Sequence, residues 1–182
     1  YISKAKNSKK GITVGSPGNG SPQHLAQAMF QNKTGANFVH VPYRGDAPLI
    51  TDMLAGQVQS AFITLSAALP QIQSGKLHAI AIANPTRIDA IKDVPTMAEA
   101  GLKDFNAATW FGIFGPAGLK SDIQQKLHAA SAKVASEATF AKRIEDMGGQ
   151  IMDLSAQQFG DYVKSEADQW AQAVKISGAR VD

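Results

Sequence analysis

One stretch of the chain has the residue types and spacing of an anion-binding loop: residues 15–22, which read Gly-Ser-Pro-Gly-Asn-Gly-Ser-Pro. Its three glycines permit a tight turn and let backbone N–H groups approach a ligand without an intervening Cβ. Ser21 can cap a following helix and Pro22 suits the first helical position, so the loop directs a helix N-terminus at its ligand. Free N–H groups and the positive end of the helix dipole favour an anion there. A tight strand–helix turn without a ligand is the alternative.

Polar residues also follow the next two expected strands. Thr64 and Ser66 come after the strand expected at 58–63, and ligands of open α/β sheets lie outside the carboxyl ends of strands. Their hydroxyls are therefore candidate ligand contacts, although they could merely cap the next helix. Gly45 and Asp46 follow the strand expected at 38–41 and open another helix, so we expect their N–H groups to reach the same cleft. We expect the neighbouring Arg44 to face solvent and to pair with Asp46.

Other anion-binding and catalytic motifs do not fit. A P-loop requires lysine after its last glycine, where this chain has Ser21, and the dinucleotide fingerprint needs a different glycine order. The chain has no Gly-x-Ser-x-Gly elbow, and its carboxylates are scattered. We therefore expect no enzyme and no catalytic residue; an α/β enzyme that binds a phosphorylated substrate at the glycine loop is the alternative.

Metal and cofactor sites are not expected either. The chain has no cysteine, and its four histidines lie on separate elements without i,i+4 spacing. We expect His24, Trp110 and Trp170 to be structural. Of the 182 residues, 44% are apolar and 18% charged, with a net charge of +3 and no basic stripe interleaved with aromatics, so nucleic acid is not an expected partner. The lack of cysteine is compatible with an oxidising compartment.

The elements that must position these residues alternate between strand and helix over residues 11–83. We expect strands at 12–15, 38–41, 58–63 and 77–83, and helices at 21–33, 46–55 and 66–73, each helix ending near a glycine. This alternation predicts a mainly parallel sheet covered on both faces. After a connector at 84–109, we expect a strand at 109–115 and three helices. Ser121 with Gln124 and Ser155 with Gln158 have capping-box spacing, and Val174 is expected to face inward.

Five motifs in order carry a family resemblance. They are Val-Gly-Ser-Pro-Gly-Asn-Gly-Ser-Pro at 14–22, His-Val-Pro-Tyr-Arg-Gly at 40–45, Ala-Leu-Pro-Gln-Ile at 68–72 with 74–77, Asp-Val-Pro-Thr at 93–96 with 99–101, and the segment from Trp110 through 116–118. Together they resemble the Bug-type extracytoplasmic solute receptors, the substrate-binding proteins of tripartite tricarboxylate transporters. The resemblance covers nearly the whole chain.

The resemblance implies an α/β fold like that of type II periplasmic binding proteins, with two lobes that close on a ligand. The usual mature protein is considerably longer at its N-terminus, so the chain resembles an N-terminally truncated fragment that lacks a signal peptide. By this comparison, residues 5–105 form a nearly complete, doubly wound second lobe. Residues 106–182 form the C-terminal part of the first lobe, with one strand and three helices.

The family's function implies a periplasmic receptor that captures a small organic mono- or dicarboxylate for membrane uptake, with membrane transporter subunits as partners. A ligand carboxylate would then be held by the backbone amides of Gly18, Asn19, Gly20 and Ser21. Several family members have an acidic residue where Ile63 stands, which argues against an ammonium group on this ligand. A ligand-sensing subunit of a signalling system is a second alternative. The apolar stripes of the C-terminal helices predict self-association through the incomplete lobe.

Overall fold

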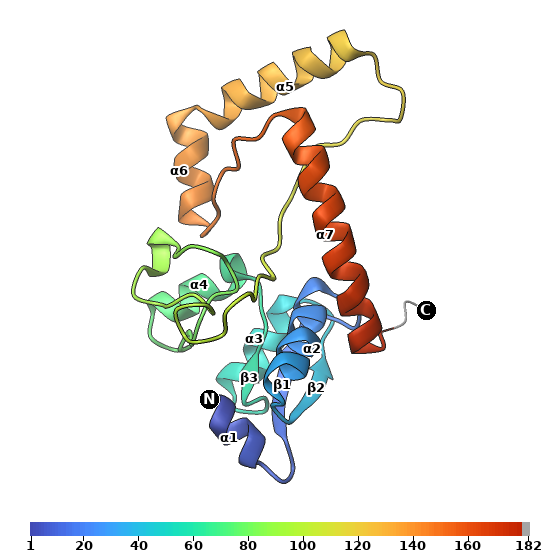
Figure 1. The fold of residues 1–182 in the computed structure, drawn as a ribbon. Helices are drawn as coiled ribbons and strands as arrows, with labels where there is room; N and C mark the ends of the chain where they lie inside the picture. Colours follow the sequence, from blue (N-terminus) through green and yellow to red (C-terminus); the bar gives the residue numbers. More distant parts are fainter. Residues whose placement is uncertain (180–182) are drawn as a thin grey trace.

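A three-stranded parallel sheet lies at the centre of the first 105 residues (Figure 1). The computed structural model describes residues 1–179. The strands are β1 (Ile12–Ser16), β2 (Phe38–Pro42) and β3 (Ser60–Ala61), in the order β2-β1-β3. The register pairs Val14 of β1 with His40 on one side and with Ser60 on the other. Because the strands are parallel, their carboxyl ends lie at one edge of the sheet.

Four helices alternate with these strands: α1 (Ile2–Asn7), α2 (Pro22–Thr34), α3 (Asp46–Leu54) and α4 (Leu65–Gln73). The last three confirm the helices expected at 21–33, 46–55 and 66–73. Helix α2 begins as its sequence predicts, since the Ser21 Oγ accepts a hydrogen bond from the His24 N–H (3.2 Å) and Pro22 occupies the first helical position. It ends at Gly35, whose φ of +67° is left-handed.

Close packing against β1 depends on a glycine. A Cβ at Gly15 would collide with the Leu49 side chain of α3, which is completely buried. The main core cluster lies around this strand and includes Ile12, Val14 and Phe30. The Phe30 ring contacts three other phenylalanine rings, at positions 38, 62 and 105. A smaller cluster of Leu69, Ile88 and Ile91 lies between α4 and the short helix η1 (Asp89–Ile91).

Two of the expected strands do not form. Residues 77–81 and 109–115 form no ladder, and the described part of this region has one isolated parallel bridge, between Ile82 and Thr96. The expected strand at 58–63 is reduced to the two residues of β3. A strand needs a neighbour to accept and donate its backbone hydrogen bonds, and no described strand lies beside β3 on its free edge.

The C-terminal part consists of α5 (Ser121–Ala135), α6 (Ala138–Asp146) and α7 (Ala156–Ser177). Helices α5 and α6 stand away from the sheet and bury none of their residues (Figure 1). The capping box of Ser155 and Gln158 forms as expected. The one expected at Ser121 does not, because α5 starts one residue earlier than that spacing requires: Lys120 is the N-cap and has no side-chain cap bond. None of the helices within residues 1–179 combines the length and hydrophobicity that crossing a bilayer requires.

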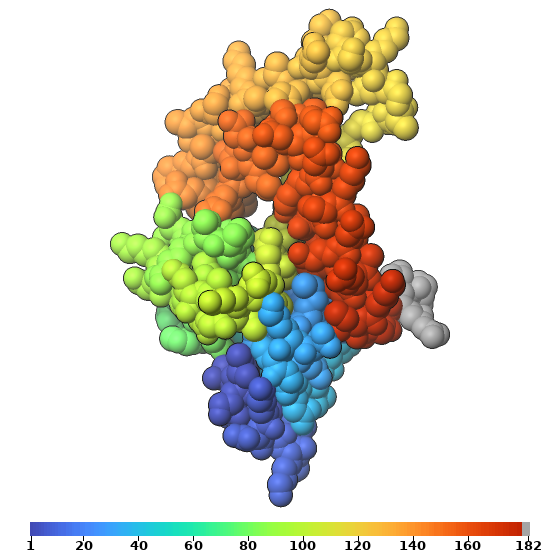
Figure 2. Space-filling model, in the orientation of Figure 1, coloured from blue at the N-terminus to red at the C-terminus, as the bar shows by residue number. Residues whose placement is uncertain are grey.

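Helix α7 returns to the first part of the chain and packs against α2 (Figures 1 and 2). The buried residues of α7 are Glu166 and Ala173, while Val174, expected to face inward, is 44% exposed. The Gln169 side chain donates a hydrogen bond to the Asn106 carbonyl (2.8 Å). The helix therefore touches both the segment that connects the two parts of the chain and the helix that follows the glycine loop.

Candidate functional site

Three loops meet at the carboxyl edge of the sheet: the glycine loop at 17–21, and the loops at 43–46 and 62–66. Backbone hydrogen bonds join them, from Tyr43 N–H to the Ser16 carbonyl (2.9 Å), from Gly45 N–H to the Pro17 carbonyl (2.7 Å) and from Phe62 N–H to the Gly15 carbonyl (3.0 Å). The structure thus brings together the three groups of polar residues that the sequence placed after successive strands. These loops contain no lysine, and their one arginine is the exposed Arg44.

Some N–H groups of the glycine loop are used within the loop. Gly20 N–H donates to the His24 Nδ1 (3.1 Å), and Ser21 N–H donates to the Gly18 carbonyl (3.2 Å). The Gly20 φ of +74° turns the chain into α2. The Gly18 N–H donates to no atom of residues 1–179, which makes it available to a ligand. Among the predicted loop donors, the structure therefore favours Gly18 over Gly20 and Ser21 in this conformation.

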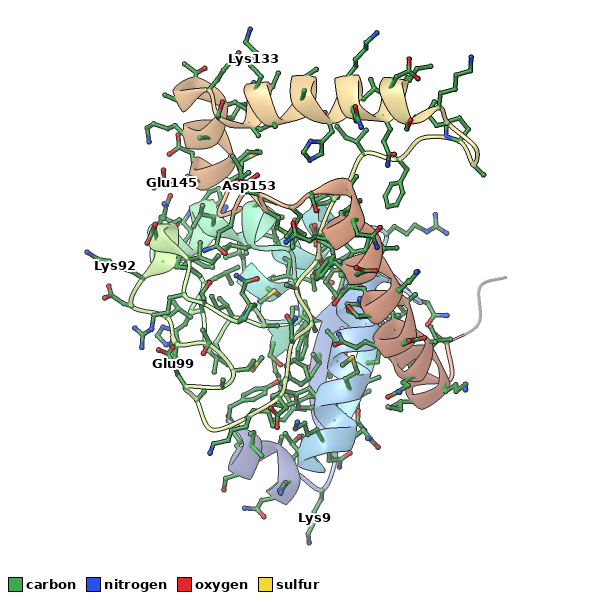
Figure 3. The ribbon with its side chains drawn as sticks, turned by 45° about the horizontal axis from the view of Figure 1, so that its top comes forward. Lys9, Lys92, Glu99, Lys133, Glu145 and Asp153 are labelled. Atoms are coloured by element: carbon green, nitrogen blue, oxygen red, sulfur yellow. The ribbon has the colours of Figure 1, made fainter. Side chains whose placement is uncertain are left out.

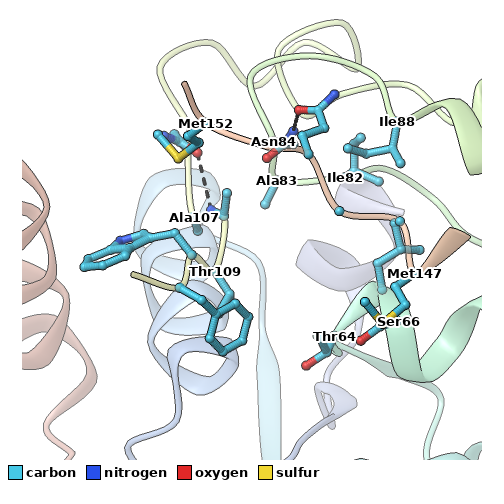
Figure 4. Close-up of a pocket in the computed structure, with 18 of the residues that line it drawn as sticks. Thr64, Ser66, Ile82, Ala83, Asn84, Ile88, Ala107, Thr109, Met147 and Met152 are labelled. Atoms are coloured by element: carbon cyan, nitrogen blue, oxygen red, sulfur yellow. Dashed lines mark hydrogen bonds between the residues drawn. The ribbon is translucent and has the colours of Figure 1, made fainter. Parts of the chain in front are cut away.

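Thr64 and Ser66 line the wall of an open cavity beside this edge (Figure 4). Thr64 is the N-cap of α4 but makes no side-chain cap bond. Its Oγ1 instead accepts a hydrogen bond from the Gln23 Nε2 of α2 (3.0 Å), which ties α4 to the helix that follows the glycine loop. Ser66 is exposed on the first turn of α4, and its hydroxyl bonds to no described residue. The Thr64 hydroxyl is therefore used to hold α4 against α2, whereas the Ser66 hydroxyl is free to contact a ligand.

The loop after β2 differs from expectation at Arg44 and Asp46. They form no ion pair; the ion pairs among the described residues join Arg87 to Glu99 (2.9 Å) and Lys142 to Asp146 (2.8 Å). The Oδ1 of Asp46 is buried at the start of α3 without a hydrogen-bond partner. A carboxylate so close to an anion site would repel a ligand carboxylate, so Asp46 is a poor side-chain contact for an anion. Gly45 separates Arg44 from Asp46, and Asp46 is already the first residue of α3.

Two histidines lie behind the glycine loop. The rings of His24 and His40 are stacked, with centroids 3.9 Å apart and planes inclined by 4°. The His40 Nε2 lies 2.7 Å from the Ser16 Oγ, at the end of β1. Burial lowers the pKa of His24, and burial together with the neighbouring His24 lowers the pKa of His40 to about 4. The sequence singled out only His24; the position of His40 opposite Val14 becomes visible only once the register is known.

A buried carboxylate joins the connecting segment to α7. Glu166, 6% exposed, accepts hydrogen bonds on one oxygen from the indole N–H groups of both Trp110 and Trp170, each at 2.9 Å. The Trp110 ring also meets Phe159 and Tyr162 edge to face. Both tryptophans are structural, as expected, but no local pattern in the sequence indicates that they share an acceptor. No group of three or more histidine, aspartate or glutamate residues within residues 1–179 is arranged to hold a metal ion.

The cavity is larger than a typical small-molecule pocket, so its volume does not indicate the size of a ligand. Its volume is about 3020 Å³, against the roughly 300–1,000 Å³ of small-molecule pockets. It opens between the sheet-containing part and α5 to α7, where Figure 2 shows a gap in the surface. The two sides touch where Gly148 approaches Leu65 and where the Asn84 side chain donates to Gln150 (3.2 Å). Several charged side chains lie on outer surfaces, as Figure 3 shows for Lys9, Lys92, Glu99, Lys133 and Glu145.

Comparison with known proteins gives consistent likenesses. The model of a family described as "Tripartite tricarboxylate transporter family receptor" matches residues 1–178. Protein BugT of Bordetella pertussis is 31% identical over 162 residues, covering 89% of this chain and 50% of that protein. A solved structure described as that of a periplasmic transporter has a TM-score of 0.84 at 37% identity, covering 100% of this chain and 60% of the other. The structure of R. palustris Rpa4515 with adipate has a TM-score of 0.82 at 26% identity, covering 98% and 60%.

These likenesses extend over nearly all of this chain but only part of the others. The chain spans about half the length of BugT and about 60% of the two solved chains. They confirm the expected α/β architecture as a partial copy of a larger binding-protein fold. The matched family is one of receptors, in agreement with the expectation that the chain is not an enzyme.

Proposed function

Because this chain belongs to the tripartite tricarboxylate transporter receptor family, we propose that it is part of a periplasmic solute-binding receptor that captures a small organic mono- or dicarboxylate for membrane uptake. One observation carries the proposal: the glycine loop lies at the carboxyl edge of a parallel sheet, beside the loops of residues 43–46 and 62–66. The adipate bound by the R. palustris relative supports a dicarboxylate as the ligand class.

The carboxylate would be held by neutral donors. The Gly18 N–H and the Ser66 hydroxyl are the available groups, and each hydrogen bond to a carboxylate contributes about 1.5–3 kcal/mol. The positive end of the α2 dipole adds to this attraction. Ile63 supplies an apolar wall at the end of β3 instead of a charge, so a ligand without an ammonium group fits this edge better.

The partners follow from the same proposal. Membrane subunits of a tripartite transporter would receive the ligand from the receptor. Self-association of the chain is supported by apolar side chains that face solvent in the C-terminal part, among them Phe111 (90% exposed), Ile113 (78%) and Leu127 (51%). Such exposure is more than isolated surface hydrophobics provide, and a second copy would cover it.

The test is an NMR titration of backbone amides, which detects weak binding by a partial site. We expect millimolar adipate to shift the Gly18 and Ser66 resonances, and its uncharged dimethyl ester to leave them in place. Ser66→Ala should weaken adipate binding severalfold, whereas Ser74→Ala at the other end of α4 should not. Equal shifts with acid and ester, or none with either, would overturn the proposal. Stronger shifts with inorganic phosphate than with adipate would favour the enzyme alternative.

A further inference from the structure

We propose that His24 and His40 are positioning residues for the glycine loop: as a stacked pair of neutral imidazoles they hold the loop in its ligand-binding shape, and protonation of the pair releases it. The pair touches the loop at both ends, at Ser16 and at Gly20. The effect on ligand affinity rests on the carboxylate site proposed above, whereas the effect on the loop does not.

The hydrogen bonds show which ring nitrogen of each histidine carries a proton. Because Gly20 N–H donates to the His24 Nδ1, that nitrogen carries a lone pair and the proton of His24 is on Nε2. The Ser16 hydroxyl donates its single proton to the Gly18 carbonyl (3.1 Å), so the hydrogen in its 2.7 Å contact with His40 comes from the His40 Nε2. Both rings thus carry a proton on Nε2, and the His24 ring is neutral; burial, which lowers the pKa of His40 to about 4, keeps the His40 ring neutral near pH 7.

A further proton does not fit this arrangement. On the His24 Nδ1 it would meet the Gly20 N–H, donor against donor, and the bond that turns the loop into α2 would be lost. Two charged rings 3.9 Å apart would also repel one another. Burial of the pair already lowers the pKa of both histidines, in agreement with the geometry.

The surroundings offer no described charge to offset a proton on the pair. On the open side, the rings border a small polar cavity formed by α2 and the end of α7, with Gln27, Gln31, Asn32, Ile176 and Ser177 on its walls. No acidic or basic side chain of residues 1–179 other than the two histidines lines it. On the sheet side, His40 pairs in register with the apolar Val14 of β1 and hydrogen-bonds to Ser16, which is completely buried. Lys33 of α2 donates to the Asp104 carbonyl.

The direction of the pH effect follows. A histidine whose pKa is lowered by the fold favours the unfolded or released state once protons bind, so loop order is complete above the ordinary pKa of about 6.5 and declines as pH falls from there towards about 4. Carboxylate affinity should decline over the same interval. A surface that merely binds anions by positive charge would instead gain carboxylate affinity on acidification. A decrease in affinity therefore distinguishes the histidine pair from such a surface.

The experiment measures hydrogen exchange at the Gly20 amide, corrected for intrinsic rate, between about pH 7.5 and about pH 4.5. We expect at least a tenfold loss of protection in the wild-type chain on acidification. His24→Asn keeps an acceptor where Nδ1 was and cannot titrate at this position, so with His40 alone left to titrate its protection should change less with pH than that of the wild-type chain. His24→Ala should be unprotected throughout, and His78→Asn, an exposed histidine elsewhere, should behave as wild type.

The outcomes separate the two proposals. Unchanged Gly20 protection in the wild-type chain, or wild-type protection in His24→Ala, would overturn the positioning role. If Gly20 protection follows pH while adipate fails to bind at either pH, the carboxylate site is wrong and the positioning role stands. If adipate binds equally at both pH values while protection is lost, the link between loop order and affinity is overturned. Far-UV circular dichroism of each variant establishes that it is folded.

Discussion

Removing the Glu166 carboxylate should loosen the junction between the two parts of the chain. In Glu166→Ala, two indole N–H groups lose a charged acceptor at 2.9 Å. Each such bond is worth about 1.5 kcal/mol at the lower end of its range, which applies because Trp110 and Trp170 are partly exposed and water can replace the acceptor. Relief of the buried charge offsets part of the loss. We expect a decrease of about 2–3 kcal/mol in the free energy of unfolding.

Glu166→Gln provides the decisive comparison. Its amide oxygen can still accept from both indoles as a neutral group, so we expect a loss of only about 1 kcal/mol. Urea unfolding followed by tryptophan fluorescence measures both variants, and the emission of Glu166→Ala should shift to the red as the indoles become solvated. Glu145→Ala on the exposed face of α6 should stay within about 0.5 kcal/mol of wild type. Equal losses in the Gln and Ala variants would refute the role of the shared oxygen.

The other predictions concern packing, capping and association. Gly15→Ala should destabilise the chain by about 1–3 kcal/mol in urea unfolding, because its Cβ would collide with Leu49. Gly160→Ala on α7, where nothing lies within 4 Å, should stabilise the chain by about 0.5–1 kcal/mol. An unchanged stability of Gly15→Ala would contradict the close packing. Ser155→Ala should lower the free energy of unfolding, measured by calorimetry, by about 1 kcal/mol, because the capping box is lost. Ser121→Ala should have little effect, since Ser121 is not an N-cap. Equal effects of the two substitutions would be inconsistent with the observed start of α5. Light scattering should show oligomers that Phe111→Ser reduces, and a compact monodisperse monomer of the wild-type chain would exclude self-association through this face.

Sequence reasoning succeeded where structure is decided locally. The start of α2 depends on Ser21 and Pro22, its end on Gly35, and all three signals act within one turn. The meeting of the three loops followed from strand alternation alone, since parallel strands must end at one edge.

It failed where a distant partner decides. The apolar run at 77–83 has the composition of a buried strand, yet a strand forms only against a neighbour, and composition does not reveal whether one is present. Glu166 and Trp110 are far apart in the chain, so no local pattern marks them as a pair. Arg44 and Asp46 are the opposite case: closeness in sequence suggested an ion pair that does not form in the structure.

The return of α7 to α2 has a consequence for how the chain folds. The two helices touch although more than a hundred residues separate them, so their contact closes a very long loop and must form late. Until α7 has been synthesised, the face of α2 that receives Ala173 stays uncovered, with the rest of the sheet able to assemble before it. The packing around the helix that follows the glycine loop is therefore completed only after α7 has been made, so this edge of the sheet acquires its final support late in synthesis.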